Sequence, residues 1–215
     1  MKTKIITIAH QKGGVGKSTI AINLAVELSK QFKVTIIDLD YQKSITIFNE
    51  TRKNNNLPNL NIKHIENQKE LIEMFKTTQG IILVDSGGFD SDLNRIALMG
   101  ADMIITPLSD NLIEIYGLEV FKKILQDLQN INKNIKAHIL LNNINPKSKK
   151  TIKELQNYIE KNNNFFTLLK SIIRRRAIFN KAFETGKSVV EIDKTSKATQ
   201  ETEKLIKEII NIINI

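Results

Sequence analysis

The residues of this chain with the clearest chemical potential form a glycine-rich loop near its beginning. Residues 11–19 read Gln-Lys-Gly-Gly-Val-Gly-Lys-Ser-Thr and lie between an apolar run and an amphipathic stretch. Glycine backbones can approach a phosphate closely, and their N–H groups converge on its oxygens at the positive end of the following helix. Lys17 is expected to reach the β- and γ-phosphates, and the Ser18 hydroxyl to bind Mg²⁺. The residues predicted to bind nucleotide here are Lys12, Gly13, Gly14, Val15, Gly16, Lys17, Ser18 and Thr19.

This loop departs from the general P-loop pattern at its start. The first glycine of the pattern falls on Gln11, and a glycine pair stands instead at positions 13 and 14. Lys12 precedes that pair, and the sequence indicates no task for this lysine within its own subunit. A second cation close to the phosphates can stabilise the charge that develops in phosphoryl transfer. The sequence of the loop therefore indicates a phosphate cradle with Lys12 as a second cationic side chain.

Three carboxylates are expected to meet the loop. Asp38 and Asp85 each end an apolar run, and Asp40 follows two residues after the first of them. Ligands of an open parallel sheet bind outside the carboxyl ends of its strands, so these aspartates should converge with Lys17. Asp38 and Asp85 can then hold Mg²⁺, while Asp40 can orient the attacking water. Taken singly, each aspartate could equally serve as a turn or helix cap.

Composition limits the class of protein. The chain has 215 residues, of which 41% are hydrophobic, and it contains no cysteine, which excludes disulfides and cysteine-ligated metal centres. We expect one domain over residues 1–215, without a signal peptide or a membrane-spanning helix. A helix-turn-helix domain is not expected before the first strand. The net charge of +9 favours nucleic acid or an anionic surface as partner, although a composition rich in Lys, Asn and Ile could also produce it.

Apolar runs alternate with stretches of helical periodicity, which predicts an α/β fold. We expect a mostly parallel twisted sheet with helices on both faces, in the architecture of a P-loop NTPase because of the loop at residues 11–19. The expected strands are Lys4–Ala9, Lys33–Asp38, Asn61–Ile65, Gly80–Asp85, Met103–Pro107, Lys136–Leu141 and Phe165–Ile172. The expected helices are Ser18–Gln31, Gln68–Thr77, Ser91–Met99, Ile113–Asn130, Lys149–Lys161 and Ser196–Ile213. Residues 53–59 are expected to form a surface loop, and Thr151 with Glu154 has the spacing of a capping box.

With these motifs the chain resembles the ParA/MinD family of deviant Walker A ATPases over nearly its whole length. Residues 12–19 match the family's signature motif in full. Residues 38–44 resemble its second motif, with Tyr41 where a proline is usual, and residues 81–88 resemble its third, with Gly87 where many members have proline. Residues 97–107 and 186–191 are also similar to short plasmid-partition members.

The resemblance implies roles for individual residues. Two ATP-bound subunits would meet face to face, with Lys12 contacting the phosphates held by the other subunit. Lys12, Lys17 and Asp40 would then be catalytic, and ATP with Mg²⁺ would be the cofactors. Asn142 is a candidate adenine contact, although a turn asparagine before Pro146 is an equally good interpretation.

The arginine triplet Arg174, Arg175 and Arg176 follows the last expected strand, where family members carry basic residues for sequence-independent DNA binding. Two alternatives are a solvated charge run and arginines at the edge of the nucleotide site. A weaker second basic patch consists of Lys147, Lys149 and Lys150.

The family divides into DNA-segregation ATPases, membrane-cycling division regulators, iron–sulfur carriers and metabolic enzymes. The absence of cysteine disfavours the carriers. The last helix mixes Lys and Glu on its polar side and lacks aromatic residues, which favours packing in the core over membrane binding. We therefore predict a partition ATPase that is cytoplasmic and nucleoid-associated. It would form a homodimer on ATP, bind DNA without sequence preference and be released by a ParB-like centromere-binding partner. A MinD-like membrane-cycling regulator and a metabolic P-loop ATPase remain the alternatives.

Overall fold

A parallel sheet forms the centre of the structure, a computed structural model that describes residues 2–111 and 113–215. Within these residues the sheet has seven strands in the order β3-β2-β4-β1-β5-β6-β7, and every paired neighbour runs parallel. The strands are β1 Lys4–Ile8, β2 Val34–Asp38, β3 Ile62–Lys63, β4 Ile81–Asp85, β5 Met103–Leu108, β6 Ala137–Ile144 and β7 Phe166–Arg174. The predicted fold class is confirmed.

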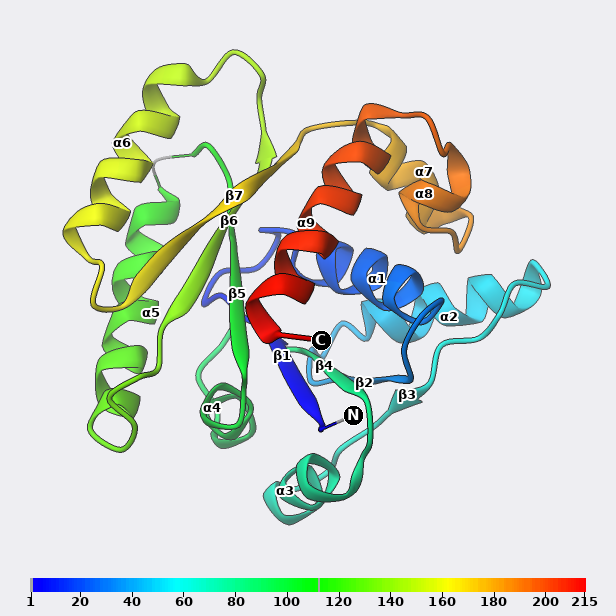
Figure 1. Cartoon of the computed structure of the whole chain (residues 1–215), viewed down its shortest axis with the longest axis horizontal. Coiled ribbons are helices and arrows are strands. Elements are labelled where there is room, and N and C mark those ends of the chain that lie inside the picture. Colours follow the sequence, from blue (N-terminus) through cyan, green and yellow to red (C-terminus); the bar gives the residue numbers. More distant parts are fainter. Residues whose placement is uncertain (1, 112) are drawn as a thin grey trace.

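Helices cover both faces of this sheet (Figure 1). One face packs against α1 Lys17–Leu28, α2 Ser44–Asn54 and α9 Lys197–Ile213, and the short helices α7 Ile178–Glu184 and α8 Val189–Ile192 lie beyond them. The other face packs against α3 Gln68–Thr77, α4 Asp92–Met99, α5 Glu114–Gln129 and α6 Lys149–Lys161. The central strands β2 and β4 are buried along their whole length because both of their faces are covered.

This strand order creates the position of the site. β1 lies between β4 and β5, so the chain builds one side of the sheet through β4 and then crosses to the other side at β5. Ligand crevices of open α/β sheets form where the direction of winding changes, outside the carboxyl ends of the strands. The glycine-rich loop after β1 therefore lies at this crevice.

The C-terminal helix α9 packs into the core, as its sequence predicted. Leu205, Ile206, Ile209 and Ile213 are buried against the sheet in the same cluster as α1. Among the described residues, no helix is long and apolar enough to cross a lipid bilayer.

Several local predictions were wrong. α2 was not predicted, although Ile45 and Phe48 are fully buried along it, and it continues to residue 54 into the stretch expected to be a loop. α6 begins two residues before Thr151, so this threonine lies inside the helix and does not cap it. A capping box does occur, but at the start of α8, between Ser188 and Glu191. The mostly polar sequence of α2 hid this helix, because its stability comes from the packing of a few buried side chains.

Candidate nucleotide-binding site

The glycine-rich loop has the backbone geometry of a phosphate cradle. Gly14 and Gly16 have φ values of 77° and 94°, a left-handed conformation that favours glycine. Gly16 precedes the first residue of α1, so the loop runs directly into the N-terminus of that helix. A Cβ atom at Gly16 would lie 2.4 Å from Nδ2 of Asn142, so a larger residue at this position would displace the Asn142 side chain. The loop therefore presents its backbone where a helix end favours an anion.

The two lysines of the loop have different surroundings. Lys17 is buried, and its Nζ donates a hydrogen bond to the carbonyl oxygen of Lys12 at 3.3 Å. The Nζ of Lys12 lies 3.2 Å from Oε1 of Glu114, at the start of α5. The view that Lys12 lacks a task in its own subunit was therefore wrong, because a carboxylate 102 positions away holds it.

The strand-end aspartates are neighbours, as predicted. Asp38 and Asp85 are paired across β2 and β4. Both carboxylate oxygens of Asp85 are buried without a hydrogen-bond partner in the described structure. Burial raises the pKa of Asp85 to about 7, the negative charge of Asp38 adds to this, and Ser18 and Lys17 oppose it. Asp38, Asp85, Ser18 and Lys17 are therefore close enough to influence one another electrostatically.

The residues present fit a bound Mg²⁺. Two buried carboxylate oxygens without donors, beside a serine hydroxyl, are the hard oxygen ligands that Mg²⁺ prefers. No group of three or more His, Cys, Asp or Glu side chains suited to a metal occurs in residues 2–111 and 113–215. Mg²⁺ commonly uses one or two carboxylates and takes its other ligands from water and phosphate oxygens.

Asp38 and Asp40 are connected through the turn after β2. One oxygen of Asp38 accepts a hydrogen bond from the backbone N–H of Asp40 at 3.2 Å, and the other accepts one from the Thr46 hydroxyl at 3.3 Å. Burial raises the pKa of Asp38, and Lys43 opposes the rise. Asp40 lines a cavity of about 490 Å³ together with Gly13, Gly14 and the loop residues from Gly16 to Thr19. Asp40 thus lies beside the phosphate cradle, and its role in orienting water stays a prediction.

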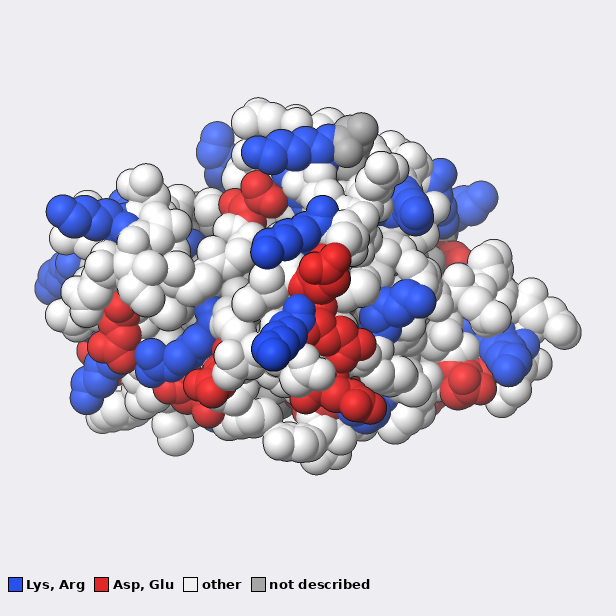
Figure 2. Space-filling model, turned by 90° about the horizontal axis from the view of Figure 1, so that it is seen from below, with Lys and Arg blue, Asp and Glu red and all other residues white. Residues whose placement is uncertain are grey.

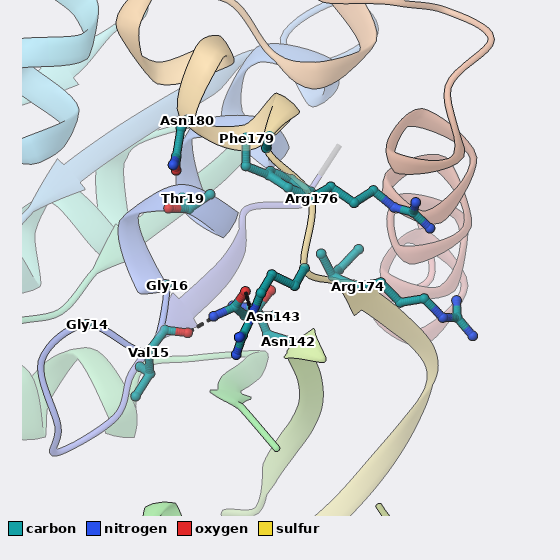
Figure 3. Close-up of a pocket in the computed structure, with 13 residues that line it drawn as sticks. Gly14, Val15, Gly16, Thr19, Asn142, Asn143, Arg174, Arg176, Phe179 and Asn180 are labelled. Atoms are coloured by element: carbon teal, nitrogen blue, oxygen red, sulfur yellow. Dashed lines mark hydrogen bonds between the residues drawn. The ribbon is translucent and has the colours of Figure 1, made fainter. Parts of the chain in front are cut away.

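A second cavity, of about 400 Å³, lies on the other side of the loop (Figure 3). Asn142 lies here, but inside β6 and not after it, because that strand continues to Ile144 through an irregular register. Its Nδ2 donates to the carbonyl oxygen of Val15 at 2.8 Å. This contact connects β6 to the loop, and the adenine role of Asn142 stays a prediction. Phe179 and Asn180 also line the cavity.

All three arginines of the triplet line the same cavity, and the Nε of Arg175 donates a hydrogen bond to Oδ1 of Asn143 at 3.2 Å. In Figure 3 the side chains of Arg174 and Arg176 extend away from the loop toward α9. Both guanidinium groups pair with Glu201, at 2.9 and 2.7 Å. Burial raises the pKa of Glu201, but the hydrogen bonds from Arg176 and Arg174 outweigh it, and the net shift is downward. One ionised carboxylate therefore pairs with two of the three arginines and neutralises only one of their two positive charges.

Arg175 is the most exposed of the triplet. Its side chain is 59% exposed, and its Nη2 lies 3.7 Å from Oδ1 of Asp110.

On the face shown in Figure 2, Lys and Arg side chains are interspersed with Asp and Glu. Of the weaker lysine patch, the side chain of Lys149 lies outside the described residues.

Sequence reasoning missed several residues of this region. Glu114 carries no motif and is found only through its contact with Lys12. Phe89 had a visible signal, since it follows directly on the Gly87-Gly88 pair at the end of the third motif. Phe179 and Asn180 lie on α7, a short helix that the sequence did not predict.

Comparisons with known proteins agree with this geometry. The sequence profile described as "CobQ/CobB/MinD/ParA nucleotide binding domain" matches residues 6–189. The maintenance of carboxysome distribution protein A of Halothiobacillus neapolitanus is 23% identical over 214 residues, which cover 97% of each chain.

Solved structures are similar over almost the whole chain. A plasmid partition protein from Borrelia burgdorferi has a TM-score of 0.68 at 22% identity and covers 98% of this chain and 99% of its own. A complex of a Cyanothece McdA variant with ATP has a TM-score of 0.73 at 17% identity, covering 100% and 97%. At these identities the structures establish the fold, while the profile match covers most of the chain.

Proposed function

Because this chain belongs to the CobQ/CobB/MinD/ParA nucleotide-binding domain family, we propose that it is a ParA-type partition ATPase that binds ATP with Mg²⁺ and dimerises on ATP. The named relatives act in partition or positioning: one is a plasmid partition protein and another maintains carboxysome distribution. One observation carries the proposal. A phosphate cradle with two lysines faces a buried carboxylate that accepts no hydrogen bond in the described structure.

Each residue of the site has a physical task in this proposal. The loop backbone and Lys17 bind the phosphates, and Ser18 with Asp38 and Asp85 would hold the metal ion. Mg²⁺, when bound, supplies positive charge that neutralises phosphate oxygens and lowers the cost of ionising Asp85. Asp40 orients the attacking water from the loop after β2. Asn142 and the cavity beside it take the adenosine end of the nucleotide.

Lys12 makes the reaction depend on a second subunit. In the structure it pairs with Glu114, and in the proposed dimer it contacts the phosphates of the other subunit. On dimerisation Lys12 exchanges the carboxylate of Glu114 for the phosphates of the other subunit. Dimerisation then depends on ATP, because the γ-phosphate provides the negative charge that competes with Glu114 for Lys12. The added cation stabilises the transition state in the way that an arginine finger does.

DNA is the proposed surface on which the dimer acts. Arg175 has the most exposed side chain of the triplet, whereas Arg174 and Arg176 share the single negative charge of Glu201. If all three arginines contacted phosphates, a dimer would offer about six contacts, and affinity would fall roughly a thousandfold between about 50 and 200 mM salt. If Arg175 alone contacts a phosphate in each subunit, the dimer offers about two contacts, and affinity would fall only roughly tenfold over the same salt range. A ParB-like partner that stimulates hydrolysis would then release the dimer.

Light scattering and DNA gel shifts with matched variants test the proposal. We expect wild type to dimerise with ATP and not with ADP, and to shift DNA of any sequence only as the dimer. Lys12→Ala should bind nucleotide but stay monomeric, and Asp40→Ala should remain dimeric because hydrolysis is lost. If Lys12→Ala dimerises at the same ATP concentration as the wild type, Lys12 does not contact the nucleotide of the other subunit. Sedimentation with anionic liposomes but not with DNA would instead favour the membrane regulator.

A further inference from the structure

Two large aromatic side chains remain exposed beside the phosphate cavity. Tyr41 is 81% exposed and Phe89 is 36% exposed, and their ring centroids lie 5.1 Å apart with the planes 20° from parallel. Tyr41 comes from the loop after β2 and Phe89 from the loop after β4, so the stack joins the two loops that follow the paired aspartates.

Gly87 makes this stack possible. A Cβ atom at Gly87 would lie 2.4 Å from Cε1 of Phe89, a distance that real Cβ atoms do not show, so the ring folds back into space that a side chain would fill. The next residue, Gly88, lies against the phosphate loop, since a Cβ atom there would be 3.4 Å from the backbone nitrogen of Gly13. Tyr41 and Gly87, which both replace prolines usual in the motifs, therefore serve one arrangement.

The stack lies at the reacting end of the site. Both rings line the cavity of about 490 Å³ with the loop residues and with Asp40. Asp40 directly precedes Tyr41, and its Oδ1 accepts a hydrogen bond from the backbone N–H of Gln42 at 2.9 Å. A restraint on Tyr41 is therefore a restraint on the short turn that carries the Asp40 carboxylate.

We propose that Tyr41 and Phe89 form an aromatic clasp that holds Asp40 over the phosphate end of the cavity. Both act as positioning residues, since they act through the turn that carries Asp40. The inference rests on the proposed ATPase function and adds what keeps the water-orienting group in place. A stacked aromatic pair changes a conformational equilibrium by a factor of roughly two to ten.

Steady-state ATP hydrolysis tests the positioning role. Tyr41→Ala and Phe89→Ala should each lower kcat roughly two- to tenfold, with KM changed less than about twofold, because the clasp orients a group and does not bind the nucleotide. The double variant should lose no more than the larger single loss, since either change removes the same stack. Tyr41→Phe keeps the ring and should retain the wild-type kcat. Ile131→Ala, at a side chain 76% exposed after the far end of α5, is the matched control.

A fluorescence measurement tests the stack without requiring turnover. The chain has no tryptophan, so Tyr41→Trp provides a single reporter at this position. The fluorescence anisotropy of this reporter should fall when Phe89→Ala is added, because the ring stacked on it is then gone and the side chain moves more freely. Equal anisotropy with and without Phe89 would overturn the clasp.

The two measurements separate the inference from the proposed function. Unchanged kcat in both alanine variants, in a wild type that hydrolyses ATP, would overturn the positioning role. A wild type that hydrolyses no ATP, with or without DNA, contradicts the proposed function. In that case the anisotropy difference and a change in Tyr41→Trp emission on addition of ATP and Mg²⁺ would still support a clasp over the cavity, and a constant emission would overturn it.

Discussion

The Nζ of Lys12 lies 3.2 Å from Oε1 of Glu114, and the two residues are 102 positions apart in the chain. The glutamate side chain is only 6% exposed and also accepts a hydrogen bond from the Ser109 hydroxyl at 3.1 Å. Lys12 is 39% exposed, so it can leave this partner without unfolding any element. The lysine proposed to act on the other subunit thus has a resting position in its own.

Glu114→Gln should therefore favour the ATP dimer. Loss of the carboxylate charge releases Lys12, while glutamine can still accept the bond from Ser109. Because Lys12 is partly exposed, we expect only a modest effect, with ATP-dependent dimerisation at roughly two- to fivefold lower protein concentration. Light scattering over a dilution series measures this. Glu119→Gln, an exposed glutamate on the same helix, is the control, and a dimer weaker than wild type would contradict the idea.

Asp85→Asn should change how stability depends on pH in the nucleotide-free protein. Burial raises the pKa of this acid from 3.8 to about 7, so its stabilising contribution is present below about pH 4 and is lost as pH rises through 7. Asparagine does not ionise, so the variant does not lose this stability as pH rises. Its free energy of unfolding should exceed that of wild type by on the order of 2–4 kcal/mol at pH 8. Urea unfolding with EDTA at pH 4.5 and 8 measures the difference, and parallel pH curves would refute it.

Arg52→Ala should destabilise the fold strongly. Arg52 is 2% exposed and donates hydrogen bonds to both oxygens of Glu191 and to the carbonyl oxygens of Gly186 and Pro58. Its removal leaves partners unpaired, which costs about 3–5 kcal/mol. Arg95→Ala, in an exposed pair with Asp90, should cost less than about 1 kcal/mol. Thermal and urea unfolding compare the two, and equal losses would contradict the assignment.

The same pair has a defined pH dependence. Burial raises the pKa of Glu191, but the hydrogen bonds from Arg52 and Ser188 outweigh it and the net pKa lies below 4.5. Its stabilisation is therefore present above about pH 4.5 and is lost as pH falls through the lowered pKa. The difference between wild type and Arg52→Ala should accordingly shrink in acid.

Arg175→Glu tests the DNA surface. If each subunit of the dimer contacts one phosphate through Arg175, the slope of log affinity against log salt should fall by about two in magnitude. Gel shifts or fluorescence anisotropy at several salt concentrations give this slope. Lys133→Glu makes the same charge change on the turn between α5 and β6, at the opposite end of the sheet from the site, and should leave the slope unchanged. An unchanged slope in Arg175→Glu would exclude this arginine.

Local pattern in the sequence was enough for the fold class and the centre of the site. Strands such as β4, Ile81–Asp85, are visible as apolar runs because both of their faces are covered. A glycine-rich loop between a strand and a helix commonly binds phosphate. Placement of Asp38 beside Asp85 followed because parallel strands bring their carboxyl ends to one edge.

Contacts between distant segments were decided only by the tertiary structure. The pairing of Glu114 with Lys12, and of Glu201 with two arginines, depends on how α5 and α9 dock on the sheet. Docking is set by the packing of whole helix faces, which local periodicity does not specify. The same holds for Phe89, whose ring meets Tyr41 only because two adjacent strands end side by side and Gly87 leaves the space between them.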